Sequence, residues 1–292
     1  MTHQRHDAPV LVLGSTGRLG SLLRHHWRDR QDVTWQARNR SAAPVLDWSA
    51  HDDLSDLTRR LPRTRAVVAL WGVVAGSAGT LGDNTELALR AIGIARATGA
   101  DRVLHCSSAA VYRPGPEPLA ETVIPAPINA YGQAKLDMEQ AIAADQRRDA
   151  LGPKNIVMRI GNVIGADSLS RAMVQASRDG TAVTLDRFAN GTGPRRSFLS
   201  GADLARSITW LVDCPLNALP CVINLAATGA TEMADLVRHA GLDLAWRPAP
   251  VDAVPLVELD TSRLRGCIGQ TDISAAAPDL MAGWSPARGV SQ

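Results

Sequence analysis

The sequence predicts an α/β fold built on a doubly wound parallel sheet. In the first half of the chain, short runs of apolar residues alternate with stretches in which apolar residues recur every three or four positions. The runs are typical of buried strands, and the stretches are typical of amphipathic helices. Strands that alternate with helices of this length favour a parallel sheet with helices on both faces, and the handedness of the connections favours the Rossmann-type order.

The elements of the first half follow one another regularly. Strand patterns cover residues 10–13, 33–35, 66–70, 102–106 and 156–158. The first helical pattern carries Leu19, Leu22, Leu23 and Trp27 on one face, and further helical patterns cover 54–61, 81–98 and 130–144. Because ligands bind at the carboxyl ends of strands in such sheets, the residues that follow each strand are the candidate site residues.

After about Gly161 the periodicity loosens. Glycines and a proline interrupt the chain between 180 and 194, helical patterns return at 200–212 and 231–239, and a strand pattern lies at 221–225. The tail from Trp246 onward is poorly periodic. We expect a Rossmann domain over residues 1–160 and a small C-terminal substrate lobe over 161–292, from which segments at about 195–228 return to the Rossmann core.

Composition excludes several classes of protein. With 31 basic and 29 acidic residues the net charge is +2, which gives no reason to expect nucleic acid or an anionic membrane as a partner. The chain has no apolar run of about twenty residues and no signal-peptide pattern at residues 1–9, so we expect a cytoplasmic protein. Neither a metal-ligand spacing nor a G-x-S-x-G elbow occurs, so neither a metal nor serine-hydrolase chemistry is expected.

A glycine-rich turn joins the first strand to the first helix. Its sequence is Gly14-Ser15-Thr16-Gly17-Arg18-Leu19-Gly20. In such a turn the first glycine permits the sharp bend, the second lets the backbone approach a pyrophosphate, and the third allows close packing of the helix. Backbone N–H groups and the helix dipole favour the phosphate charge. These seven residues predict a dinucleotide site, and an ordinary strand–helix turn is the alternative.

The end of the second strand bears on the choice between NAD and NADP. An acidic residue there would bind the ribose 2′-hydroxyl of NAD, but residues 36–40 contain no carboxylate. Arg38 and Arg40 could instead clamp a 2′-phosphate, so NADP is expected, with NAD as the second candidate. Solvated loop arginines are the alternative. Asp47 is a candidate adenine contact or a helix N-cap.

Tyr131 and Lys135 stand four positions apart on a predicted helix and therefore share a face. The chain has only two tyrosines and two lysines, so a tyrosine and a lysine at this spacing would rarely arise by chance. A neighbouring ammonium lowers the pKa of a phenol, which makes the pair suitable for moving a proton beside a hydride carrier. Ser108 follows a predicted strand at the ligand-binding edge and could hold the reacting oxygen; turn chemistry is the alternative.

Together these motifs resemble the extended short-chain dehydrogenase/reductase family, in its NAD-dependent epimerase/dehydratase branch. The resemblance covers most of residues 9–265. It rests on the glycine turn at 14–20, D-N-T-E-L-A around Asn84, and the segments at 107–112, 131–135, 159–165, 195–205, 223–227 and 259–264. It implies that Tyr131 moves the substrate proton, that Ser108 orients the substrate oxygen, and that Lys135 tunes Tyr131 and binds the nicotinamide ribose. Asn84 would support this set.

The resemblance also implies binding residues. Asn162 and Arg196 fall where the family contacts the diphosphate of a nucleotide sugar, and Leu70-Trp71-Gly72 would border the cofactor, although a Trp-Gly pair is unusual there. Ala109 and Ala110 replace the acidic pair of the family's dehydratases, which argues against water loss.

The family commonly forms dimers, and a homodimer is expected through the helices at 82–98 and 130–145. We expect their outer faces to carry Leu87, Ala88, Ala91, Ile142 and Ala143.

Three functions remain open from the sequence. An epimerase of nucleotide sugars would return the hydride to the other face of the same carbon, which suits the motifs as a set. A reductase of a keto sugar or related carbonyl compound would exchange NADPH at each turnover, which Arg38 favours. A non-catalytic NADP-binding redox sensor would have no use for the Ser-Tyr-Lys set.

Overall fold

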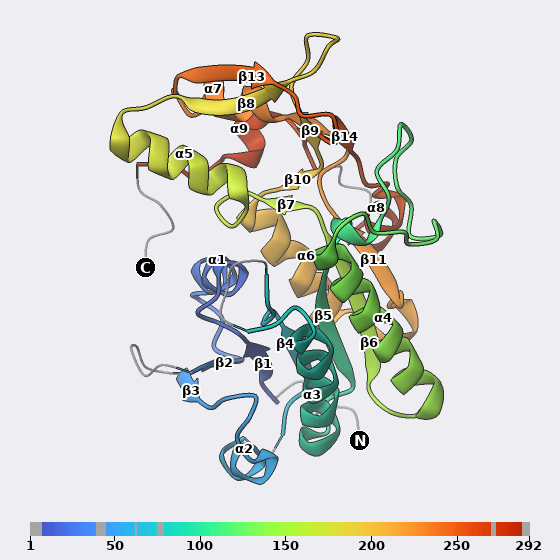
Figure 1. Ribbon diagram of the computed structural model, residues 1–292. Helices are drawn as coiled ribbons and strands as arrows, with labels where there is room; N and C mark the ends of the chain where they lie inside the picture. Colours follow the sequence, from blue (N-terminus) through green and yellow to red (C-terminus); the bar gives the residue numbers. More distant parts are fainter. Residues whose placement is uncertain (1–7, 39–44, 62, 75–78, 270–272, 288–292) are drawn as a thin grey trace. The chain divides into compact units, whose positions relative to one another are not determined.

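The computed structural model describes residues 8–38, 45–61, 63–74, 79–269 and 273–287 (Figure 1). The chain forms two compact units. The first consists of Met1–Val111, Pro125–Arg159 and Ile208–Ile223. The second consists of Tyr112–Ile124, Ile160–Ser207 and Asn224–Gln292.

The central sheet has seven strands in the order β11-β6-β5-β4-β1-β2-β3. They are β1 Val10–Leu13, β2 Val33–Ala37, β3 Val45–Asp47, β4 Ala66–Ala69, β5 Arg102–Ser108, β6 Lys154–Ile160 and β11 Val222–Leu225. The neighbours from β3 through β5 pair in parallel. This order confirms the predicted doubly wound sheet of the Rossmann type, with one strand, β3, that the sequence did not predict because it is only three residues long.

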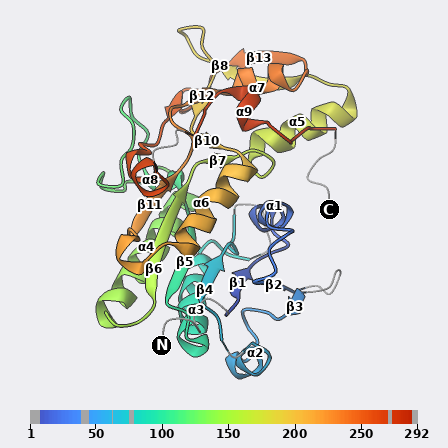
Figure 2. The same cartoon turned by 180° about the vertical axis from the view of Figure 1, so that it is seen from behind.

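Helices cover both faces of this sheet. They are α1 Arg18–His26, α2 Leu54–Arg60, α3 Asp83–Thr98, α4 Ala130–Arg148 and α6 Gly201–Asp213. On one face, Leu11 and Val67 of the sheet form a core with Leu57 of α2 and Ile94 of α3. On the other lie α1 and α6 (Figure 2). The indole of Trp27, just after α1, donates a 3.0 Å hydrogen bond to Thr209 of α6. Each large apolar side chain buried in this way contributes about 1.5–3 kcal/mol.

The packing of α3 against α4 corrects the predicted dimer faces. Ala88 of α3 and Ile142 of α4 lie in one core cluster with Val157 of β6, and Ala91 is fully buried in the neighbouring cluster. Ala88, Ala91 and Ile142 therefore face the interior of the unit and cannot form an outer surface. For these three the prediction is wrong, because the two helices pack on the sheet and on each other and bury the apolar stripe of each. Of the other two predicted residues, Leu87 is half-buried and Ala143 is exposed.

The second unit is made of short elements. Its strand pairs are β7 Asn162–Val163 with β10 Phe198–Leu199, β8 Val183–Arg187 with β13 Leu244–Pro248, and β9 Arg195–Arg196 with both β12 Thr231–Glu232 and β14 Leu256–Val257. Its further helices are α5 Ser168–Asp179, α7 Met233–His239, α8 Ser262–Cys267 and α9 Ala277–Leu280. The tail that looked poorly periodic thus contains elements too short to show a period.

Within the described ranges, no helix combines the length and the apolar character needed to cross a bilayer.

Candidate functional site

The turn between β1 and α1 has the geometry that its glycines predict. Gly14 adopts a positive φ of 79°, and a Cβ atom added to it would lie 2.7 Å from the backbone of Trp71. A Cβ atom on Gly20 would lie 2.3 Å from the carbonyl oxygen of Gly14, which no real side chain tolerates. The helix therefore starts directly against the turn, with the backbone of Gly17 exposed at its N-cap.

A buried glutamine that the sequence did not single out ties this turn to the sheet. The backbone N–H of Gly14 donates to Gln36 Oε1 at 2.9 Å, and Gln36 Nε2 donates to the carbonyl oxygen of Trp48. The N–H of Ser15 donates to the main-chain oxygen of Gln36 at 3.0 Å. A polar residue inside the apolar strand β2 was the available signal.

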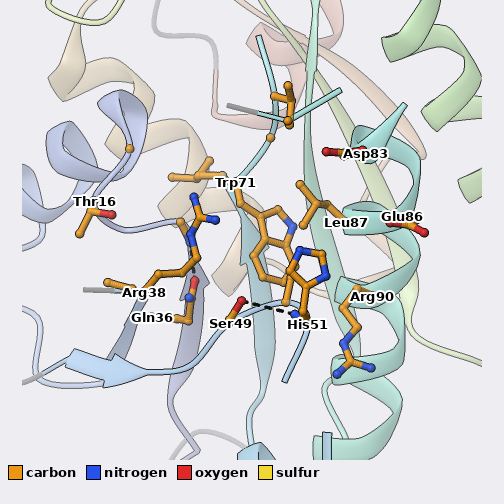
Figure 3. A pocket seen from close by; sticks show the side chains of 18 of the residues that line it. Thr16, Gln36, Arg38, Ser49, His51, Trp71, Asp83, Glu86, Leu87 and Arg90 are labelled. Atoms are coloured by element: carbon orange, nitrogen blue, oxygen red, sulfur yellow. Dashed lines mark hydrogen bonds between the residues drawn. The ribbon is translucent and has the colours of Figure 1, made fainter. Parts of the chain in front are cut away.

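A pocket of about 1010 Å³ opens beside the turn (Figure 3). This volume is at the upper end of ligand pockets, which span about 300–1000 Å³. Its lining includes Gly14, Thr16, Gly17, Gln36, Arg38, Ser49, His51, Leu70, Trp71, Gly72, Asp83, Glu86, Leu87 and Arg90. All these residues belong to the first unit. Of the predicted cofactor contacts, Gly14, Thr16 and Gly17 of the turn meet there with Arg38 and residues 70–72, whereas Ser15, Arg18, Leu19 and Gly20 do not line the pocket.

The indole of Trp71 lies in the middle of the pocket, between Arg38 and Leu87 (Figure 3). One side of it packs against the apolar core, and its Nε1 is buried with no hydrogen-bond partner among the described residues. Arg38 and His51 are exposed at the rim. His51 comes from a loop without periodicity, so no sequence pattern marks it as a site residue.

The sequence also predicts cofactor contacts by Asp47 and Arg40. Asp47 ends β3 and is not among the residues that line the pocket. Its alternative role as an N-cap is wrong, because Asp53 caps α2 and accepts a hydrogen bond from the N–H of Ser55 at 2.9 Å. Arg40 lies outside the described residues.

Lys135 is almost completely buried on α4, and its ammonium group is held from two other elements. Its Nζ donates to Asn84 Oδ1 at 3.0 Å and to the carbonyl oxygen of Cys106 at 2.9 Å. The Asn84 amide in turn donates to the carbonyl oxygen of Val73 at 2.9 Å. A Cβ atom on Gly72 would lie 2.9 Å from Asn84 Oδ1, so the glycine makes room for this contact.

Tyr131 lies one turn before Lys135, near the start of α4. Asn129 caps this helix by accepting a 2.8 Å hydrogen bond from the N–H of Gly132. The Lys135 ammonium is 6.0 Å from the centre of the phenol ring. Ser108, at the end of β5, lies close enough to Tyr131 for its hydroxyl to lower the pKa of the phenol. The structure therefore gathers Ser108, Tyr131, Lys135 and Asn84 into one cluster.

The electrostatics of the cluster differ from the expectation that an ammonium lowers the tyrosine pKa. Burial raises the pKa of Tyr131 to about 12, which the Ser108 hydroxyl and the charge of Arg18 offset only in part. Burial also lowers the pKa of Lys135. The ammonium is directed to Asn84 and to a backbone carbonyl oxygen, so the phenolate gains little from it here.

The remaining predicted residues belong to the second unit. Asn162 lies on β7, where it pairs with Phe198 of β10. Arg196 lies on β9, and its guanidinium donates to the carbonyl oxygens of Val254 at 2.8 Å and of Pro255 at 3.3 Å. In this structure Arg196 therefore joins its strand to the segment before β14. Among the described residues, no group of three or more His, Cys, Asp and Glu side chains could hold a metal ion.

Comparison with known proteins places this fold and site in a family. The sequence profile of the NAD dependent epimerase/dehydratase family matches residues 10–226. The chain belongs to this family. The match spans the glycine turn, the Ser-Tyr-Lys cluster and Arg196, and it confirms the resemblance on which the sequence prediction drew.

Sequence identity to individual proteins is low. UDP-glucose 4-epimerase of Azospirillum brasilense is 31% identical over 192 residues, which are 59% of this chain and 54% of that protein. MoeE5, solved in complex with UDP-glucuronic acid and NAD, superposes with a TM-score of 0.77 at 21% identity, over 94% of this chain and 96% of its own. UDP-glucose 4-epimerase of Thermotoga maritima, solved with UDP-glucose, gives a TM-score of 0.76 at 19% identity, covering 93% and 96% of the two chains. At these identities the two structures establish the fold alone.

Proposed function

We propose that this protein is an NAD(P)-dependent epimerase of a nucleotide sugar and that Tyr131 is its acid/base. The observation that carries the proposal is the cluster of Ser108, Tyr131 and Lys135 in the same unit as the glycine turn. Family membership and the similarity to a UDP-glucose 4-epimerase support it. Ala109 and Ala110 form a short 3₁₀ turn without an acidic side chain, which disfavours the dehydratase activity also found in the family.

The first unit fits a dinucleotide. The turn at 14–20 packs so closely that a Cβ atom on Gly14 or Gly20 would clash with backbone, whereas Gly17 stays exposed at the start of α1, and the pocket beside the turn is large enough for a nucleotide. Residues 14–20 would hold the pyrophosphate, Leu70-Trp71-Gly72 would border the cofactor, and Lys135 would bind the nicotinamide ribose. A dinucleotide held by these residues would supply hydride transfer at the sugar carbon.

The residues of the cluster then move the proton. Ser108 holds the substrate oxygen at the end of β5, and Tyr131 Oη removes the hydroxyl proton and later gives it back. Since the pKa of Tyr131 is about 12 in this structure, the phenolate form requires positive charge close to the ring. Lys135 is the nearest ammonium, and Asn84 keeps it in place.

Further parts of the proposal concern ligands and assembly. Arg38 lines the pocket with no carboxylate beside it on β2, which supports a 2′-phosphate and hence NADP over NAD. Asp47 ends β3 outside the pocket lining, so we do not propose an adenine contact for it. The second unit would bind the nucleotide sugar through Asn162 and Arg196. A homodimer remains a proposal, but it needs helix faces other than the buried ones.

A net reductase of a keto sugar or related carbonyl compound is the second candidate, because Arg38 favours the cofactor that reductases exchange. The state of the cofactor separates the two. We expect denatured wild-type protein to release a tightly held dinucleotide if it is an epimerase. Protein that purifies without dinucleotide and oxidises NADPH with a keto sugar would be a reductase. No turnover with any sugar or carbonyl compound would favour a redox sensor.

Tyr131→Phe tests the acid/base assignment. With UDP-glucose and its 4-epimer as probes, interconversion should fall by about 10²–10⁴-fold, the usual contribution of a general acid/base. The dissociation constant for dinucleotide should change by less than about twofold, because the ring remains. Tyr112→Phe is the matched control, since it alters the only other tyrosine, which hydrogen-bonds to Asn224. An undiminished rate in Tyr131→Phe would refute the proposal.

A further inference from the structure

A buried ion pair lies behind the cluster. Arg159 Nη2 donates to Glu139 Oε2 at 2.7 Å, and Arg159 Nε lies 3.1 and 3.2 Å from the two carboxylate oxygens. The hydroxyl of Ser107 donates to Glu139 Oε1 at 2.5 Å. The side chains of Glu139 and Arg159 are only 8% and 5% exposed. One carboxylate thus joins β5, α4 and β6.

Stability alone does not account for this arrangement. Removing two charges from water is costly, and well-packed apolar side chains in place of a buried pair are often as stable or more so. The location suggests another role. Ser107 precedes Ser108, so a hydrogen bond that fixes Ser107 also fixes the backbone that carries Ser108. Glu139 follows Lys135 by one helical turn, which puts the two side chains on one face of α4.

Glu139 is the negative charge in the surroundings of Lys135. The other titratable or charged groups near Lys135 are Tyr131 on α4, His105 and Cys106 on β5, and Arg159 on β6; α3 contributes the neutral Asn84. Burial raises the pKa of the Cys106 thiol and lowers that of His105 to about 4, so both are neutral at pH 7. Burial lowers the pKa of Lys135, and Cys106 and, to a smaller extent, the Glu139 carboxylate oppose that shift; Glu139 is the one carboxylate among these groups.

We propose that Glu139 is a positioning residue: its carboxylate holds Ser107, and with it Ser108, at the end of β5, and it keeps Lys135 in the ammonium form. The proposal rests on the proposed function, since it assigns a task to groups that act through Ser108, Tyr131 and Lys135. It makes a prediction about the unliganded protein, because the carboxylate acts on Lys135 with or without substrate.

The two lysines of the chain permit a direct test. In a Lys154→Arg background, Lys135 is the only lysine, so the signal of ¹³Cε-labelled lysine in an NMR titration reports its pKa alone. Glu139→Gln keeps an oxygen for Ser107 but removes the charge. We expect the pKa of Lys135 to fall by about one unit, the lower end of the effect of an opposite charge at this range. An unchanged or higher pKa would overturn the proposal.

Two variants serve as controls. Asp137→Asn removes the same charge from the exposed face of α4, where Asp137 accepts from Gln133, and the Lys135 pKa should change by less than about 0.2 units because water screens that site. Glu139→Asp keeps the charge and should retain most of the wild-type pKa. If Glu139→Gln fails to fold, Glu139→Gln with Arg159→Met leaves no unpaired buried charge, and a smaller fall in the same direction is expected.

The experiment distinguishes failure of the Glu139 proposal from failure of the proposed function. The titration uses neither substrate nor dinucleotide, so a normal Lys135 pKa in Glu139→Gln would leave the role of Tyr131 untouched. Conversely, full activity of Tyr131→Phe together with a lowered Lys135 pKa would remove the proposed function and keep the electrostatic effect of Glu139.

Discussion

The cluster around Lys135 and the pocket around Trp71 belong to the same unit but are built differently. In the cluster, regular elements supply the side chains, and Asn84 and Lys135 hydrogen-bond to each other and to backbone carbonyls. In the pocket, Arg38 and His51 come from loops and are exposed, and Trp71 Nε1 has no hydrogen-bond partner in the described part of the chain. The difference teaches that the groups proposed to move protons are arranged by the fold itself, whereas we expect the surface proposed to recognise the nucleotide to be completed by its ligand.

The buried region around Lys135 contains a titratable side chain, His105, whose burial should make the stability of the fold depend on pH. His105 on β5 is fully buried; its Nε2 pairs with Asn155 Oδ1 at 3.0 Å, and burial lowers its pKa from 6.5 to about 4. A group whose folded pKa is depressed favours the unfolded state when it is protonated. Stability is therefore complete above about pH 6.5 and should decline by about 3 kcal/mol as the pH falls toward 4.

Chemical denaturation at a series of pH values measures this decline. His105→Gln can still donate to Asn155, and we expect its free energy of unfolding to change much less between pH 6.5 and 4 than that of the wild type. His25→Gln, an exposed histidine of the same unit, should leave the wild-type slope unchanged. Equal slopes in the wild type and His105→Gln would show that the interior of β5 does not contribute in this way.

Gly72 touches both regions, so Gly72→Ala tests how sharply they are separated. The added methyl group would lie 2.9 Å from Asn84 Oδ1 and 3.3 Å from Lys135 Nζ, so one of the two must move. We expect turnover to fall by about 100-fold, as when a positioned catalytic group is displaced. Dinucleotide affinity, measured by calorimetry, should fall much less.

The matched control is Gly93→Ala in α3. Gly93 also lines the pocket, but a Cβ atom there meets nothing within 4 Å. This variant should be active and up to about 1 kcal/mol more stable, because alanine is the better helix former. Normal turnover in Gly72→Ala would mean that the Asn84–Lys135 contact is dispensable.

The sequence predicted the local parts of this site and missed the long-range ones. The glycine spacing at 14–20 and the Tyr131–Lys135 interval are set by one turn and one helix, so they can be read from neighbouring residues. The ion pair of Glu139 with Arg159 joins residues 20 positions apart on different elements, and only the sheet order brings them together. An arginine inside the apolar strand β6 was a signal that some buried partner had to exist.

The second unit was less predictable for a related reason. Its strands β7, β9, β10, β12 and β14 are two residues long, so each forms through pairing with distant segments rather than through its own pattern. The predicted lowering of the Tyr131 pKa was wrong for another reason. The spacing of Tyr131 and Lys135 is as expected, but spacing alone says nothing about burial, which is the largest cause of the raised pKa.

Arg38→Ala examines the rim of the pocket, where the ligand is expected to complete the site. Loss of a charge-assisted contact to a 2′-phosphate should weaken NADP binding by about tenfold or more and leave NAD within about twofold. Calorimetric titration with both dinucleotides gives the ratio. Arg28→Ala, which removes an exposed arginine outside the pocket, should affect neither. Equal losses for NAD and NADP would remove the preference for NADP.

Trp71→Leu should have the smallest effect on dinucleotide binding and should not discriminate between NAD and NADP. The indole offers an aromatic face to the pocket, and an aromatic contact with the bound nucleotide contributes about 0.5–1.5 kcal/mol, so both dinucleotides should bind roughly two- to tenfold more weakly. Trp71→Phe keeps a ring and should restore part of the loss. Because NAD and NADP share every ring system, a change confined to NADP would mean that Trp71 acts by placing Arg38, and the pocket would then be as interdependent as the cluster around Lys135.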